Sequence, residues 1–151
     1  KLNSLSDYEM IDMLYEASRA GVKIDLIIRG ICCLVPGIPG MSENIRAISV
    51  VDKFLEHPRL YVFHNDGNTE MYISSADWMT RNLDRRVEIS CPIYDEDIKK
   101  ELLETFEICW NDNVKARILS KDQDNRYIRN NSKKIRSQMA TYDYYLNKLA
   151  N

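Results

Sequence analysis

Apolar positions along the chain recur at two periods, one typical of helices and the other typical of strands. Residues 6–20 repeat their apolar side chains at helical spacing, with Ser6 and Glu9 as a capping box and Gly21 as a stop signal, so we predict a helix there. The same spacing predicts two more amphipathic helices, at 95–110 and at 133–149, the second with one apolar face formed by Ile135, Met139, Tyr142, Leu146 and Leu149.

Runs of β-branched and aromatic residues between these helices predict strands. Residues 22–29, with the sequence VKIDLIIR, are expected to form a largely buried strand that places Arg29 at its C-terminal end. The Asp66-Gly67 pair predicts a hairpin between two of three further strands, at 59–63, 70–76 and 85–93. The Pro- and Gly-rich residues 35–46 are expected to form a loop. Interleaved helices and strands predict a layered α/β domain.

The amino-acid composition is that of a typical folded globular domain. The 151 residues are 44% hydrophobic and 29% charged, which is close to the average for folded domains. No apolar stretch approaches the roughly 20 residues that a membrane helix needs. The N-terminus has neither an initiator Met nor an apolar core, so we expect residues 1–151 to be one domain inside a longer protein. The cysteines match no zinc pattern and are expected to be buried, reduced thiols: Cys32, Cys33, Cys91 and Cys109.

The net charge of −2 conceals an uneven distribution along the chain. Residues 84–112 contain nine acidic and four basic side chains, whereas residues 115–136 contain eight basic and two acidic ones. Such a basic run is either an ordinary solvated face or a contact surface for a polyanion, since repeated phosphates attract many loosely ordered cations.

Both histidines lie in the run LEHPRLYVFH, residues 55–64. His57 is the stronger candidate for chemistry, because strand alternation would put Arg59 on the same face, and a cation beside an imidazole suits a transferring phosphoryl group. Further along, Ser74, Ser75 and Asp77 complete an arrangement like half of a phospholipase-D-like site. That motif has Lys and Asp where this chain has Arg59 and His64, so a carboxylate-oriented relay on this strand is in doubt, and His64 is interpreted as solvent-facing.

Longer blocks make a more specific resemblance. AGVKIDLIIRGICCLVPG, SENIRAISVVDKFLEHPRLYVFHN and YISSADWMTRNLDRRVEISCPI, followed by VKARILSKDQDNRYIR and IRSQMATYDYYL, resemble the C-terminal catalytic domain of bacterial polyphosphate kinases of the first type, of the phospholipase-D-like superfamily. The resemblance implies a mixed β-sheet flanked by helices. It also implies reversible, Mg²⁺-dependent transfer of the terminal phosphate between ATP or ADP and inorganic polyphosphate through a phosphohistidine.

Carried onto this chain, the resemblance implies that Arg29 and His57 contact the nucleotide phosphates, while the phosphohistidine belongs to the preceding domain, outside these residues. His57 would act either as a proton donor or as a stabilising cation. Arg59 and Arg81 are weaker candidates for polyphosphate contacts, no metal ligand is assigned, and Mg²⁺ is expected mainly outside this segment. Trp78 is interpreted as a core residue rather than a stacking partner for adenine.

The resemblance also implies partners and a location. We expect ATP, polyphosphate and the preceding domain as partners, a homo-oligomer in the full-length protein, no nucleic acid and no transmembrane segment. The location would be the cytoplasm, with peripheral attachment of the full-length protein to the inner membrane as an alternative. Two other functions stay open: a phospholipase-D-like phosphodiesterase or nuclease, and a non-catalytic module that binds polyanions.

Overall fold

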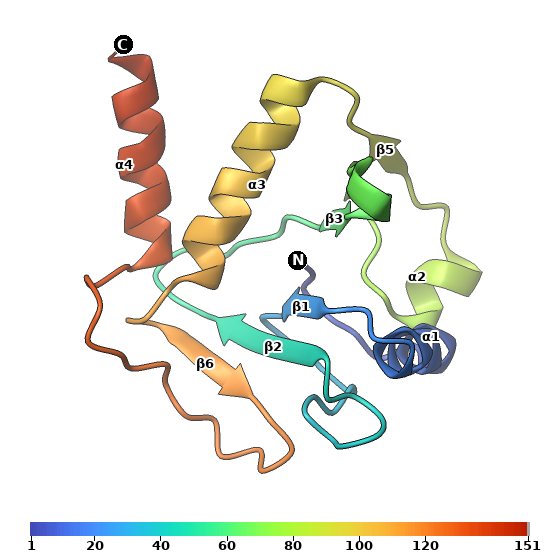
Figure 1. Cartoon of the computed structure of the whole chain (residues 1–151). Helices are drawn as coiled ribbons and strands as arrows, with labels where there is room; N and C mark the ends of the chain where they lie inside the picture. The colour runs from blue at the N-terminus through green and yellow to red at the C-terminus, as the bar shows by residue number, and fades with distance from the viewer. Residues whose placement is uncertain (151) are drawn as a thin grey trace.

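The computed structural model describes residues 1–150, and within this range the chain is a mixed α/β domain of four α-helices and two three-stranded sheets (Figure 1). The first sheet has the strand order β1-β2-β6 and the second has the order β3-β4-β5. In chain order the elements are α1 (Tyr8–Arg19), β1 (Ile24–Ile27), β2 (Ile45–Val50), β3 (Leu60–Phe63), the short 3₁₀ helix η1 (Asn65–Gly67), β4 (Glu70–Ser74), α2 (Thr80–Arg85), β5 (Ser90–Pro92), α3 (Glu96–Trp110), β6 (Ala116–Leu119) and α4 (Ser137–Leu149).

The first sheet is mixed, as expected. β1 runs parallel to β2 with Ile24 opposite Ile45, and β6 runs antiparallel to β2 with Ala116 opposite Val50. The second sheet is entirely antiparallel: the predicted hairpin joins β3 to β4, with Phe63 opposite Glu70, and β5 pairs with β4. The mixed pairing is therefore confined to one of two separate sheets.

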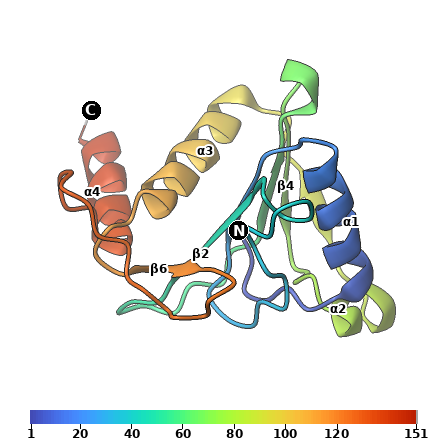
Figure 2. The same ribbon diagram turned by 60° about the horizontal axis from the view of Figure 1, so that its bottom comes forward.

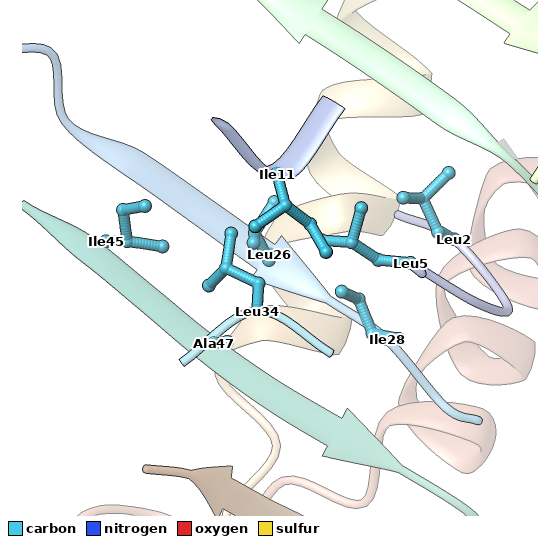
Figure 3. Close-up of a cluster of buried hydrophobic side chains, with 8 residues drawn as sticks. All are labelled: Leu2, Leu5, Ile11, Leu26, Ile28, Leu34, Ile45 and Ala47. Carbon is cyan, nitrogen blue, oxygen red and sulfur yellow. The ribbon is translucent and has the colours of Figure 1, made fainter. Parts of the chain in front are cut away.

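Helices cover both faces of the first sheet (Figure 2). On one face, a cluster of buried side chains joins α1 to the strands (Figure 3), and its members are Leu2, Leu5, Ile11, Leu26, Ile28, Leu34, Ile45 and Ala47. On the other face, Ile27, Ile48 and Val50 pack against Cys109 of α3, with Phe106 and Trp110 beside them. Because successive strand residues point to opposite faces, β1 and β2 contribute to both clusters, and their only polar residues are Asp25, Arg46 and Ser49.

Residues 1–5 are extended and lie between the two sheets. The backbone nitrogen of Lys1 donates to the Leu60 carbonyl at 2.7 Å, and the Leu60 N–H donates back to the Lys1 carbonyl at 3.0 Å. The next N–H, that of Leu2, donates to the Ile27 carbonyl at 2.9 Å. The segment is thus hydrogen-bonded to β3 on one side and to the end of β1 on the other.

Several predicted boundaries need correction. α1 is capped by Asp7, whose carboxylate accepts from the Met10 N–H at 3.1 Å, and the predicted capping box at Ser6 does not form. Arg29 lies two residues beyond the end of β1. The predicted strand at 85–93 shortens to β5, because Arg85 ends the unpredicted helix α2.

Two groups of side chains differ from their predicted burial. On α4, the expected apolar face is largely exposed at Tyr142, Leu146 and Leu149, so the helix does not bury these side chains within residues 1–150. All four cysteines are free thiols, but only Cys109 is buried, while Cys33 and Cys91 are exposed. The prediction of uniformly buried cysteines is therefore wrong.

Candidate functional site

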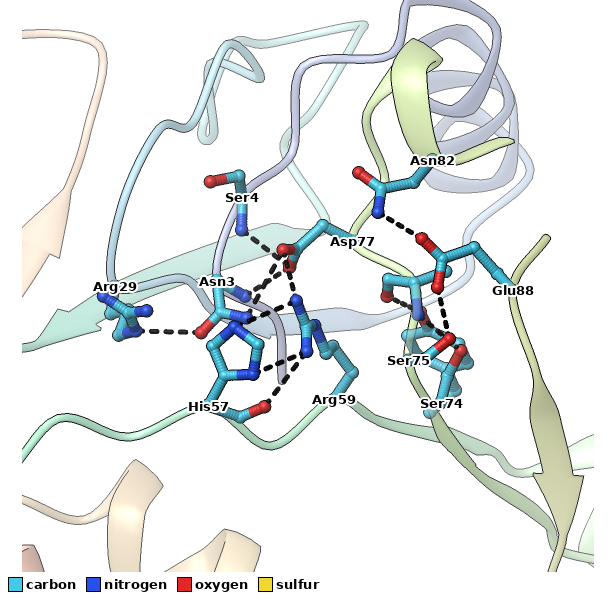
Figure 4. A network of polar contacts seen from close by, with 12 residues as sticks. Asn3, Ser4, Arg29, His57, Arg59, Ser74, Ser75, Asp77, Asn82 and Glu88 are labelled. Carbon is cyan, nitrogen blue, oxygen red and sulfur yellow. Dashed lines mark hydrogen bonds and ion pairs between the residues drawn. The ribbon is translucent and has the colours of Figure 1, made fainter. Parts of the chain in front are cut away.

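A buried carboxylate, Asp77, is the centre of a polar network between the sheets (Figure 4). Its Oδ1 accepts the backbone N–H groups of Asn3 at 2.8 Å and Ser4 at 3.1 Å. Its Oδ2 accepts from Arg59 Nη2 at 2.8 Å and, at a longer 3.3 Å, from Asn3 Nδ2. Asp77 therefore ties the N-terminal segment to the second sheet.

Arg59 connects this carboxylate to His57. Its Nη1 lies 2.8 Å from His57 Nδ1 and 3.3 Å from the His57 carbonyl, so the two side chains are in contact as predicted. Both residues precede β3, so strand alternation is not the reason for this contact. A guanidinium has only donors, so the ring nitrogen at 2.8 Å acts as an acceptor, which places the proton of a neutral imidazole on Nε2. Nε2 is 3.3 Å from Arg59 Nη2, another donor, so that contact is not a hydrogen bond of this tautomer. His57 is exposed, and its Nε2–H is then able to donate to an incoming group.

Arg29 joins the same network from the segment that follows β1. Its Nε donates to Asn3 Oδ1 at 2.8 Å, and the same Asn3 side chain contacts Asp77. Within residues 1–150 no hydrogen bond engages the two terminal nitrogens of Arg29, so the end of the guanidinium is left for another acceptor. Arg29 also lines a cavity of about 10 Å³, which is space for roughly one water. Glu56 and Pro58, the sequence neighbours of His57, line the same cavity.

Electrostatics keep the central carboxylate charged. Burial alone would raise the pKa of Asp77, but the hydrogen bonds from Arg59 and from the Ser4 and Asn3 N–H groups outweigh it and hold the pKa below its usual value. The anion neutralises Arg59, whose side chain is 10% exposed. Arg59 therefore serves as the partner of Asp77 and as a neighbour of His57, with little of its surface open to a polyanion.

The two serines near Asp77 are engaged elsewhere. Ser75 Oγ donates to Glu88 and accepts from the Ile89 N–H at 3.0 Å. Ser74 Oγ lies 2.9 Å from Ser90 Oγ. These hydroxyls join β4 to the segment that leads into β5, and they make no contact with His57 in the described part of the chain.

The remaining predicted site residues lie outside the network. Arg81 is exposed on α2, and His64 is exposed where the β3–β4 hairpin turns. Trp78 packs against the core cluster of the first sheet and lies 5.2 Å from the Tyr61 ring, as predicted for a core residue.

The basic run is partly neutralised by its own surroundings. Arg136 makes two 2.7 Å hydrogen bonds to Asp52, and the guanidinium groups of Arg117 and Arg129 lie 3.8 and 4.4 Å from the centre of the Tyr127 ring. Lys133 and Lys134 are exposed. The part of the run that remains open to a polyanion is therefore smaller than its charge count indicates.

Neither a metal-binding cluster nor a membrane-spanning helix is present in residues 1–150. No group of three or more His, Cys, Asp or Glu side chains is arranged to hold a metal ion. In the same range, no helix has the length and apolar character needed to cross a membrane.

Comparison with known proteins decides the family. The model of the family described as polyphosphate kinase C-terminal domain 2 matches residues 1–138. The chain belongs to this family. It is 55% identical over 148 residues to the polyphosphate kinase of Vibrio parahaemolyticus serotype O3:K6 and 50% identical over 145 residues to that of Escherichia coli K12. The crystal structure of polyphosphate kinase from Porphyromonas gingivalis superimposes with a TM-score of 0.94 at 48% identity.

These relatives are much longer than this polyphosphate kinase domain. The alignments cover 97% and 95% of this chain but only 21% of the Vibrio and Escherichia proteins, and the superposition covers 23% of the Porphyromonas chain. The chain thus spans about a fifth of the length of the curated relatives that it matches.

Sequence reasoning missed one member of the network in this polyphosphate kinase domain. Asn3 bridges Arg29 and Asp77 through its side chain and its backbone N–H, although 74 positions separate it from Asp77. A single Asn in an extended N-terminal segment follows no catalytic spacing, and only the tertiary contact reveals its place.

Proposed function

We propose that this domain supplies one half of the active site of a polyphosphate kinase, which reversibly transfers the terminal phosphate of ATP to inorganic polyphosphate. The observation that carries the proposal is the network in which Arg29, after β1, and His57, before β3, both connect to the Asn3–Asp77 contact, Arg29 directly through Asn3 and His57 through Arg59. Membership of the polyphosphate kinase C-terminal domain 2 family supports the same reaction.

The two side chains suit complementary tasks in phosphoryl transfer. The free end of the Arg29 guanidinium offers a fork of donors that matches the oxygens of a phosphate. His57, with Nδ1 held by Arg59, presents Nε2–H to a phosphoryl oxygen and can stabilise or protonate it as charge develops. The phosphohistidine would come from the preceding domain of the full-length kinase, so these residues would face it from across the nucleotide.

The described residues do not form a site for Mg²⁺, which the family implies. Both oxygens of Asp77 already accept hydrogen bonds, and its nearest charged neighbour is the Arg59 cation. Hard cations such as Mg²⁺ need carboxylate or phosphate oxygens that are free to coordinate. Any Mg²⁺ would therefore be held by the nucleotide phosphates or by other parts of the kinase.

The test uses the full-length kinase that contains this domain. Arg29→Ala and His57→Ala should each reduce phosphate transfer from ATP to polyphosphate by about a hundredfold or more, because each removes a group aimed at the transferring charge. His64→Ala is the matched control, since His64 is an exposed imidazole in the turn after β3 with no contact to the network, and it should retain near-normal activity.

Other outcomes point to other functions. Near-normal rates in both Arg29→Ala and His57→Ala would refute the assignment of the site. Hydrolysis of a phosphodiester without ATP, abolished by His57→Ala, would favour a phospholipase-D-like phosphodiesterase instead. Unchanged polyphosphate affinity and activity in every variant would favour a module that only binds polyanions.

A further inference from the structure

Two open strand edges face one groove. β1 is at the edge of the first sheet and β3 is at the edge of the second. Between them lies a cavity of about 830 Å³, and residues Ile24–Ile28 and Leu60–Asn65 line its two sides. Unpaired sheet edges are normally covered or blunted, because their free N–H and C=O groups favour pairing with another strand.

The alternation of hydrogen bonds shows which backbone groups are free along β1. The N–H groups of Ile24 and Ile28 donate toward the β2 side, to Asn44 and Ile48. In a strand, alternate residues direct their N–H and C=O groups to opposite sides, so Asp25 and Ile27 direct theirs into the groove. The Ile27 carbonyl accepts the Leu2 N–H at 2.9 Å, which confirms this direction.

The same reasoning applies to β3. The Ser74 N–H donates to the Arg59 carbonyl at 3.0 Å, so residues 59, 61 and 63 bond to β4. Leu60 and Val62 therefore direct their N–H and C=O groups away from β4, toward the groove. Leu60 is already bonded there by Lys1, and Val62 has no backbone partner in the described part of the chain.

Lys1 and Leu2 occupy one end of this groove in strand geometry. The reciprocal hydrogen bonds between Lys1 and Leu60 are those of an antiparallel pair, and Leu2 pairs with Ile28 in a parallel register. Continued backward, the register places the residue directly before Lys1 opposite both Leu26 and Tyr61. The residue before that falls opposite Asp25 and Val62.

We propose that the residues directly preceding Lys1 in the full-length polyphosphate kinase form a β-strand that fills this groove, parallel to β1 and antiparallel to β3. The strand joins the two three-stranded sheets into one continuous mixed sheet. Its N–H and C=O groups alternate between Asp25 and Ile27 on one side and Val62 on the other. The inference depends on membership of the family and does not depend on the proposed reaction.

The side chains that line the groove define the character of this strand. Phe106 approaches from α3, and Leu14, Ala17 and Trp78 approach from the face that carries α1. A strand between them is covered on both faces, so its residues should be a short, nearly continuous apolar run. The same strand would cover Val62 and Phe63, whose side chains are 37% and 48% exposed.

Covalent continuity makes this segment a better occupant than a second protein. The matched relatives are about five times as long as this chain, and the family is a C-terminal domain, so further residues precede it in the full-length kinase. Because those residues leave Lys1 at the mouth of the groove and already in register, their effective concentration there is far higher than that of any separate molecule.

Hydrogen exchange on the unmodified full-length kinase tests the proposal. The amides of Val62 and Ile27 should exchange at least about a hundredfold more slowly than in an unstructured peptide, since each donates to the inserted strand. The amide of Phe63, which bonds to β4, is the internal control and should be protected with or without the strand. Exchange of Val62 and Ile27 at the unstructured rate, with Phe63 protected, would overturn the proposal.

A cross-link identifies the occupant. With the exposed Cys33 and Cys91 replaced by Ser, we combine Val62→Cys with Cys at the second residue before Lys1, a directly opposed antiparallel pair at disulfide distance. Oxidation should give a disulfide within one chain. The matched control combines His64→Cys with the same Cys before Lys1, a pair that is out of register. It should give at most a tenth of the disulfide yield of the Val62→Cys pair. A disulfide between two chains would identify a second copy as the occupant and refute the proposal, as would equal yields in both pairs.

Discussion

Burial, and not distance, should decide how much an ion pair stabilises this domain. Two Asp–Arg pairs allow a direct comparison. Arg46 makes two hydrogen bonds to Asp25, at 2.7 and 2.6 Å, whereas Arg59 makes a single 2.8 Å hydrogen bond to Asp77. The side chains of the first pair are 68% and 34% exposed, and those of the second are 10% and 8% exposed. Replacing each Asp by Ala separates the two effects.

The magnitudes follow from what each substitution leaves behind. Asp77→Ala leaves the Arg59 charge buried, beside an Nε that already lacks a partner within residues 1–150. It also removes the acceptor of the Asn3 and Ser4 N–H groups. Breaking a buried pair costs about 3–5 kcal/mol, and an orphaned buried donor costs about 1–3 kcal/mol. Since these terms overlap, we expect a loss of about 4 kcal/mol for Asp77→Ala, against about 0–1 kcal/mol for Asp25→Ala.

Urea unfolding followed by circular dichroism measures both variants. With a slope of about 2 kcal/mol per molar urea, a loss of about 4 kcal/mol lowers the midpoint by about 2 M, whereas Asp25→Ala shifts it by less than about 0.5 M. If Asp77→Ala is already unfolded without urea, its loss of stability is at least as large as expected. If Asp77→Ala lies within about 1 kcal/mol of Asp25→Ala, the reasoning from burial is wrong.

Three further predictions concern other parts of the molecule. Burial would raise the pKa of Asp112, but hydrogen bonds from four backbone N–H groups outweigh burial and hold this pKa below its usual value. The Asp112 carboxylate therefore stabilises the fold above about pH 4, and this stabilisation is lost as the pH falls. Asp112→Asn should therefore flatten the fall in unfolding free energy between about pH 5 and pH 2, measured in urea at several pH values; an unchanged slope would contradict this. Leu5 is fully buried, so Leu5→Ala should cost about 3 kcal/mol and Leu5→Met less than about 1.5 kcal/mol; equal costs would mean that no cavity forms. In the full-length kinase, reversing Lys133 and Lys134 to Glu should weaken polyphosphate binding and reduce its salt dependence, and an identical salt slope would exclude both side chains from the contact.

Local sequence signals predicted the elements whose boundaries are set locally. α3 begins after Asp95, whose side chain accepts from the Asp97 and Ile98 N–H groups, and its apolar positions repeat at helical spacing. The β3–β4 hairpin follows from Asp66 and Gly67, both of which adopt positive φ. In each case the residues that determine the element lie within it.

Tertiary contacts determine the elements that the sequence did not predict. β2 follows the Pro- and Gly-rich loop and carries an exposed Arg46 among its apolar residues, which masks its place at the centre of the first sheet. β6 has only four residues and lies in the basic run, where charge hides its pairing with β2. Such short strands exist because a neighbouring strand satisfies their backbone, and a single sequence does not show that neighbour.

The candidate site divides in the same way. Arg29 and His57 were predicted because their residue types and the resemblance point to phosphate chemistry. The hydrogen bonds that connect Arg29 to His57 were not predicted, since they run through the Asn3 side chain and the Arg59–Asp77 pair. Motifs identify groups that act on a substrate, whereas groups that orient them need only be near in space.

The position of Asn3 links the geometry of the site to the groove between the sheets. Asn3 holds Arg29 from one sheet and Asp77 from the other, and it lies two residues after Lys1, where the chain is hydrogen-bonded to β3. A strand inserted ahead of Lys1 would fix the separation of β1 and β3, and with it the spacing of Arg29 and His57. Disrupting that strand, for example with Pro at the second residue before Lys1, should therefore reduce phosphate transfer while leaving Arg29 and His57 in place. Pro has no N–H to donate to the Val62 carbonyl, which weakens the pairing of the inserted strand with β3. The Val62 N–H, which would donate to that strand, should then exchange faster in parallel. Raised exchange at Val62 with unchanged phosphate transfer would show that the site does not depend on the strand.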